Sequence, residues 1–298
     1  MNSYLIFTDS AADMPLHVIE EFDIRFIPMD YMLDGESVTF HTEDPDRDRH
    51  CDELYEKLRK GASVHTSQIT PWTYIENWKP LLEEGHDILY LAFSSGLSAT
   101  YENAMNAAGT LQEEFPDRKL VVVDSLSSTG GQGLLTHAAA LNRANVMSIS
   151  ENAAWITEHA KNVGHRFTVG DLDFLHRGGR VSAATAIIGG MLNIKPVMIM
   201  DDEGKLQVVS KARGINASLK SLVRSTQREL GVENVPKLVY ITHSSVYDKA
   251  QDLINMARMV FGEETPIECI CETPIIGVHT GPEFLAIFAW CRHRKEGD

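Results

Sequence analysis

The chain has 298 residues, of which 43% are hydrophobic, and its 42 acidic side chains outnumber 27 basic ones to give a formal net charge of −15. This length and apolar content suffice for one large core or two smaller ones. The negative charge opposes binding to nucleic acid and to anionic membrane surfaces, because both need a basic face. We therefore expect no nucleic-acid partner and no stable membrane insertion.

The chain shows no sign of export. Its N-terminus has no basic region followed by a long apolar one, and no apolar run elsewhere reaches membrane-spanning length. The cysteines show no paired disulfide framework; they are Cys51, Cys269, Cys271 and Cys291. We expect reduced thiols in a cytoplasmic protein.

In the first half of the chain, apolar runs of strand length alternate with segments of helical period, which is typical of a parallel sheet covered by helices. Strands are expected at residues 4–8, 24–28, 87–93 and 120–123. The Asp34-Gly35 step predicts a hairpin over residues 33–40. Helix starts are predicted in the segment 12–15 with its proline, at Thr70-Pro71, and at Ser98 as an N-cap.

The second half of the chain has a different pattern. Residues 195–200 and 206–211 flank an Asp-Asp-Glu-Gly turn and are expected to form an antiparallel hairpin. Helices near residues 217–230 and 246–260 flank a strand at residues 238–243. We place a boundary near residue 160, with an N-terminal α/β domain over residues 1–160 and a C-terminal α/β domain over residues 161–298.

Polar side chains follow the expected strands where each strand ends. Asp9 comes directly after the strand expected at residues 4–8, and Asp124 after the strand expected at residues 120–123. Ser94-Ser95-Gly96 follows the strand expected at residues 87–93. Ligands of open α/β sheets bind beyond the carboxyl ends of the strands, so these side chains are expected to cluster. We interpret both carboxylates as helix-cap or loop-bonding groups. The serine pair can be a hydrolase nucleophile, a phosphate cradle or a donor set for a carboxylate.

The first two of these interpretations lack their motifs. A hydrolase elbow needs Gly-x-Ser-x-Gly, and Ala92 stands where the first glycine belongs. Neither Gly-x-x-x-x-Gly-Lys-Ser/Thr nor Gly-x-Gly-x-x-Gly follows a strand, and the glycine cluster at residues 130–133 is expected to ease a helix start against the sheet. No His or Cys pair has metal-ligand spacing. We therefore expect no cofactor.

A carboxylate site fits the remaining polar residues better. A buried carboxylate needs several aligned donors to offset its desolvation. Hydroxyls of the Thr66-Ser67-Gln68 loop and of the serine pair, together with the imidazole of His279, can supply them.

Six motifs in the same order resemble the DegV family. They are Thr8-Asp9-Ser10, Thr66-Ser67-Gln68, the run from Ser94-Ser95-Gly96 to Tyr101, Arg177-Gly-Gly-Arg180-Val-Ser182, Ile194-Lys195-Pro196, and Gly277-Val-His279-Thr-Gly-Pro282. They span almost the whole chain. One such motif would be a weak signal, whereas six in register are strong.

The resemblance implies a two-domain α/β fold, with an N-terminal Rossmann-like domain around a parallel sheet and a C-terminal α/β domain around a mixed sheet. It also implies a tunnel between and into the C-terminal domain for a long-chain fatty acid. The carboxylate is expected at Thr66, Ser95 and His279, with Ser67, Ser94 and Gly96 beside them. The chain is then a non-catalytic subunit that presents the acid to a separate ATP-dependent kinase, which makes acyl-phosphate for phospholipid synthesis.

Further expectations concern the surface and the tunnel walls. The basic residues Arg177, Arg180, Lys211 and Arg213 are candidates for docking the kinase. Arg177 and Arg180 can instead bond carbonyl groups across the domain junction. The tunnel walls are expected in residues 167–174, 183–192 and 275–288. Glu283 stands where the family has glycine, and a carboxylate there can repel the ligand or change the loop that sets His279. The alternatives are a lipid carrier or sensor without a kinase, and an acyl hydrolase that uses Ser95 with His279.

Overall fold

The computed structural model describes residues 4–182, 185, 193–229, 235 and 237–294. The parallel sheet has the strand order β2 (Ile24–Ile27), β1 (Leu5–Asp9), β6 (Ile88–Ala92) and β7 (Leu120–Asp124). The mixed sheet has the order β10 (Leu206–Arg213), β9 (Ile194–Met200), β8 (Val163–Thr168), β13 (Leu285–Trp290), β11 (Val239–His243) and β12 (Ile267–Cys271). A small antiparallel sheet joins β4 (Glu36–Phe40), β3 (Met29–Leu33) and β5 (Val64–Thr66).

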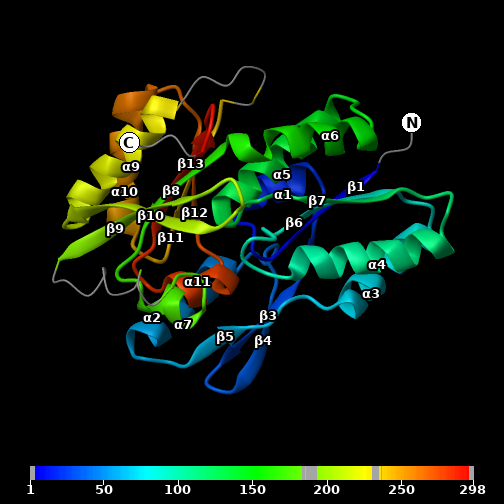
Figure 1. The fold of residues 1–298 in the computed structure, drawn as a ribbon, viewed down its shortest axis with the longest axis horizontal. Helices are drawn as coiled ribbons and strands as arrows, with labels where there is room; N and C mark the ends of the chain where they lie inside the picture. The colour runs from blue at the N-terminus through cyan, green and yellow to red at the C-terminus, as the bar shows by residue number, and fades with distance from the viewer. Residues whose placement is uncertain (1–3, 183–184, 186–192, 230–234, 236, 295–298) are drawn as a thin grey trace.

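Helices separate and cover the larger sheets, as Figure 1 shows. Their bounds are α1 (Leu16–Glu21), α2 (Arg47–Arg59), α3 (Pro71–Glu83), α4 (Thr100–Glu114), α5 (Thr129–Ala144), α6 (Ile149–His159), α7 (Asp173–Arg177), α9 (Ile215–Glu229), α10 (Tyr247–Phe261) and α11 (Pro274–Thr280). Helix α4 packs on β6 and β7, and α9 and α10 pack on the mixed sheet. Helix α5 lies between the sheets, because it contacts β1 of one and β8, β11 and β13 of the other.

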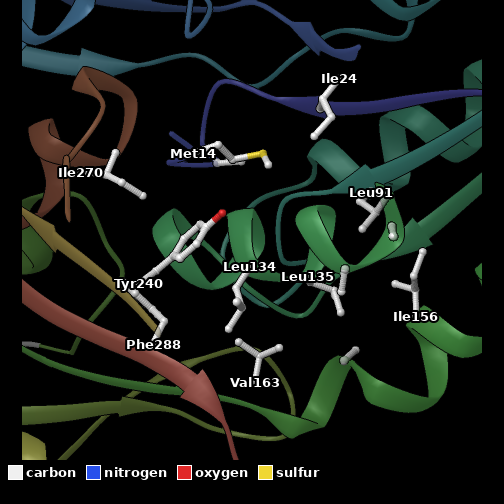
Figure 2. Packing of buried hydrophobic residues seen from close by; sticks show 14 of the residues in the cluster. Met14, Ile24, Leu91, Leu134, Leu135, Ile156, Val163, Tyr240, Ile270 and Phe288 are labelled. Atoms are coloured by element: carbon white, nitrogen blue, oxygen red, sulfur yellow. The ribbon is translucent and has the colours of Figure 1, made fainter. Parts of the chain in front are cut away.

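The core continues from one large sheet to the other across α5. Figure 2 shows Leu134 and Leu135 of this helix among side chains of both sheets, including Leu91, Val163 and Phe288. All of these side chains belong to one cluster of buried apolar residues. The division at residue 160 stays a prediction. The parallel sheet ends with Asp124 and the mixed sheet begins with Val163 in sequence, yet they share this core.

The structure confirms the α/β class, with a parallel sheet followed by a mixed one. Strands β1 and β6 are buried at every position, which explains the apolar runs at residues 5–7 and 88–92. The predicted hairpins form as well. Asp34 and Gly35 have φ values of 51° and 92°, which is the left-handed geometry of a tight hairpin turn, and β9 pairs antiparallel with β10.

Two helix starts differ from the predictions. Helix α1 has Pro15 as its N-cap, outside the first turn and without a side-chain cap. Helix α4 begins at Thr100, with Ala99 as its N-cap rather than Ser98. The shift has a local cause, because the backbone N–H of Ser98 donates to the Ser94 carbonyl in a tight turn. The Ser98 hydroxyl still accepts from the Thr100 N–H, at 3.2 Å.

Candidate functional site

A cavity of about 490 Å³ has walls from both halves of the chain. Most of its lining is apolar and includes Phe93, Leu97, Phe167, Met200, Phe284 and Phe288. Residues of the predicted segment 275–288 line it, whereas the predicted segment 167–174 contributes Phe167. The third predicted segment, 183–192, lies outside the described residues except for Thr185. The volume and the mostly apolar lining suit an apolar ligand with a polar end.

A hydroxyl and an imidazole meet on one wall of this cavity. Thr66, at the end of β5, places its Oγ1 atom 2.8 Å from Nε2 of His279, in the last turn of α11. Burial and the nearby Arg180 guanidinium lower the pKa of His279 to about 3. The imidazole is therefore neutral near pH 7 and has one N–H donor and one acceptor. Ser67 lies on the same wall.

The Gly-Gly turn after α7 supports the histidine ring. A Cβ atom at Gly178 would lie 2.5 Å from Nδ1 of His279, so only a glycine permits this approach. Arg180, expected to be a docking residue, lies on the cavity wall, and burial lowers its pKa. Arg177 is exposed, with its guanidinium 4.4 Å from the centroid of the Phe174 ring.

The Ser94-Ser95-Gly96 loop packs against the turn between β9 and β10. The buried Ser94 hydroxyl donates to the Gly204 carbonyl at 2.9 Å. A Cβ atom at Gly96 would lie 2.4 Å from the Glu203 carbonyl oxygen. Ser95 is exposed and does not line the cavity, whereas the next residues, Leu97 to Ala99, do. Ser94 and Gly96 therefore fix the loop, and the ligand contact assigned to Ser95 stays a prediction.

Two carboxylates hold this loop from the parallel sheet. The fully buried Asp9 accepts hydrogen bonds from the Phe93 N–H at 2.9 Å and the Tyr90 hydroxyl at 2.7 Å. Asp124 accepts from the Ser95 N–H at 3.2 Å. Their predicted role as loop-bonding groups is thus confirmed.

The remaining predicted residues lie away from the cavity wall. Lys211 and Arg213 are exposed on β10, which is the edge strand of the mixed sheet. Glu283 does not line the cavity, and its carboxylate lies 2.7 Å from the Lys195 ammonium. The exposed Glu283 carboxylate is therefore paired with Lys195 and is not part of the cavity lining.

The sequence interpretation missed a second group of polar wall residues. Ser128 and Thr129, at the start of α5, line the cavity together with the buried His165 of β8. The available signal was the glycine cluster that follows them. A Cβ atom at Gly131 would lie 2.1 Å from His165 Nε2, so these glycines let the helix start approach the mixed sheet closely.

The described residues offer little to other kinds of chemistry. Within them, no three His, Cys, Asp or Glu side chains gather into a metal site. No helix in the described ranges is long and apolar enough to cross a membrane. The hydrolase alternative needs a contact between Ser95 and His279. Within the described residues, His279 forms its side-chain hydrogen bond with Thr66 instead.

Comparison with known proteins agrees with this architecture. Residues 3–292 match the family described as "Uncharacterised protein, DegV family COG1307". A DegV domain-containing protein of Clostridium perfringens is 36% identical over 291 residues, which cover 97% of both chains.

Solved structures show the same fold. A DegV lipid-binding protein of Thermotoga maritima superposes with a TM-score of 0.82 at 26% identity, over 98% of this chain and 100% of that one. A fatty-acid-binding DegV family protein of Thermus thermophilus gives a TM-score of 0.81 at 27% identity, over 97% and 99%. With the family match over nearly its full length, the chain belongs to the DegV family.

Proposed function

We propose that the protein binds a long-chain fatty acid, with the tail in the apolar cavity and the carboxylate at the Thr66–His279 pair. The observation that carries the proposal is the neutral hydroxyl–imidazole pair on the wall of a cavity that is lined on other sides by Phe93, Phe167 and Phe288. The relatives from Thermotoga maritima and Thermus thermophilus, described as lipid-binding and fatty-acid-binding, support it.

The tail would supply most of the affinity. Burying about fourteen methylene groups at about 0.8 kcal/mol each gives roughly 11 kcal/mol before the costs of association are subtracted. The head-group donors then fix the depth at which the chain stops. Neutral donors can do this without an ion pair, provided that each one is aligned with a carboxylate oxygen.

The tautomer of His279 decides what Thr66 offers the ligand. When Nε2 carries the proton, it donates to Thr66 Oγ1, and the threonine O–H is free to donate to a carboxylate oxygen. Ser95 remains the proposed second donor, because its hydroxyl is exposed at the end of the loop held by Asp124. Arg180 adds a positive charge on the same cavity wall. Thr66 and Ser95 would then hold one carboxylate oxygen, and the other oxygen would stay accessible.

We also propose that the chain performs no chemistry on the acid and presents it in the cytoplasm to a separate ATP-dependent kinase. Free thiols at all four cysteines support a reducing compartment. In an acidic protein, exposed basic side chains such as Lys211 and Arg213 suit a docking surface. Charge reversal at Arg213 should abolish acyl-phosphate formation with the host's kinase and leave bound fatty acid unchanged. A carrier or sensor without a kinase partner would form no acyl-phosphate in either protein.

The test of fatty-acid binding is organic extraction of the purified protein followed by mass spectrometry. The wild type should yield about one long-chain fatty acid per chain, and Thr66→Val should lose most of it. Thr136→Val is the matched control, because Thr136 is buried on α5, donates to Gln132 and does not line the cavity. Equal lipid content in the wild type and Thr66→Val would contradict the assignment of the head group.

A further inference from the structure

Helix α11 carries His279 but has only seven residues, so neighbouring elements must fix its position. One hydrogen bond links the residue that precedes the N-cap of α11 to the last residue of the helix. Glu272 lies before the helix, and its Oε2 atom accepts a hydrogen bond from the hydroxyl of Thr280 at the far end, at 2.7 Å. Thr280 is the neighbour of His279 in sequence and lines the cavity.

We propose that Glu272 is a positioning residue for the head-group site, which sets His279 against Thr66 by tying the end of α11 to its start. The inference rests on the proposed function, since it adds a residue to the same site. Glu272 touches neither Thr66 nor the cavity and acts through Thr280 and the helix.

Tyr55 of α2 fastens the same carboxyl group from the other half of the chain. Its hydroxyl lies 3.0 Å from Glu272 Oε2 and 3.0 Å from the Glu272 carbonyl oxygen. The tyrosine fits against bare backbone, because a Cβ atom at Gly277 would lie 2.2 Å from its hydroxyl oxygen. Helix α11 is thereby held between the Glu272 side chain and α2. Rotation or sliding of the helix would break these contacts and move His279.

The surroundings of Glu272 raise its pKa. The residue is fully buried, and burial together with the nearby Asp13 raises its pKa well above the ordinary value. The Cys271 thiol of β12 acts in the same direction, while hydrogen bonds from Thr280 and Tyr55 oppose the shift. This shift of the pKa favours the neutral carboxylic acid over the carboxylate. Glutamine, which has the same shape and also offers a carbonyl oxygen to Thr280 and Tyr55, should replace it.

The experiment compares Glu272→Gln with Glu272→Leu in two measurements. Fatty-acid affinity should stay within about twofold of wild type for the glutamine variant and fall about tenfold for the leucine variant, because the hydrogen bond that fixes Thr280 is lost. NMR titration of His279, assigned by the signal that His279→Gln removes, gives the second readout. Its pKa should rise toward 6.5 in the leucine variant only, as the ring loses its buried position.

Asn152→Leu is the control for general destabilisation, since Asn152 is fully buried and bonds Tyr4 and Ala139, away from α11. It should leave both measurements unchanged. If Glu272→Leu does not fold, Thr280→Val removes the same hydrogen bond from its other partner and should give the same shift of the His279 pKa. The inference would be overturned if a variant that lacks the Glu272–Thr280 hydrogen bond kept the wild-type affinity and an unshifted His279 pKa. If the wild type binds no fatty acid, the proposed function fails, and the His279 titration still decides the role of Glu272.

Discussion

Replacing Gly96 by alanine should destabilise the protein by forcing two backbone segments apart. The added Cβ atom would lie 2.4 Å from the Glu203 carbonyl oxygen and 2.7 Å from the Gly204 carbonyl carbon and oxygen. These are main-chain atoms, so no rotamer change relieves the overlap. The free energy of unfolding should fall by about 1–3 kcal/mol, as for an overpacked core. Fatty-acid affinity should fall as well, because the adjacent Leu97 lines the cavity.

The assay is equilibrium denaturation in urea, with Gly109→Ala as the matched control. Gly109 lies within α4, and nothing lies within 4 Å of the position its Cβ would take. That variant should gain roughly 0.5–1 kcal/mol, because alanine is the better helix former. If Gly96→Ala unfolds at the wild-type midpoint with an unchanged m-value, the loop does not pack against the β9–β10 turn as described.

Three further predictions concern the carboxylates. Burial raises the pKa of Asp13 from its ordinary 3.8 to about 7, so the folded protein keeps a proton that the unfolded chain loses between these values. The free energy of unfolding should therefore decrease through this group as the pH rises from about 4 to 7. Asp13→Asn should flatten that part of the stability curve and be more stable than the wild type at pH 8, and an unchanged slope would refute this. Tyr90→Phe should cost about 1.5–3 kcal/mol in thermal or urea unfolding, because it removes a buried hydrogen bond to Asp9; a wild-type midpoint would be inconsistent with that bond. Glu283→Gly should change fatty-acid affinity by less than about twofold in a titration, because Glu283 does not line the cavity and its charge is paired with Lys195; a tenfold change would place its charge at the ligand.

The strands of the parallel sheet could be predicted because burial on both faces leaves a direct mark in the sequence. Residues 88–92 are all buried and all apolar apart from the Tyr90 hydroxyl, which bonds Asp9. Turns with special backbone geometry left an equally local mark, as in the Asp34-Gly35 step. The start of α4 was misplaced by one residue because a tight turn around Ser94 competes with the helix for backbone N–H groups.

The site was less accessible to such reasoning, because its residues meet only in three dimensions. Thr66 and His279 are 213 positions apart, and the family resemblance, rather than any period or spacing, brought them together. Arg180 was a docking candidate because it is a basic residue in an acidic protein. It lies on the cavity wall, beside a turn that packs against the His279 ring, and its docking role stays a prediction. No local pattern reveals that the far end of α11 is tied to Glu272.

The most direct test of the central claim is a crystal structure of the protein saturated with a long-chain fatty acid. The proposal predicts the tail in the cavity lined by Phe167 and Phe288, with a carboxylate oxygen about 2.5–3.0 Å from Thr66 Oγ1. A carboxylate bound elsewhere, or an empty cavity in a saturated crystal, would contradict it.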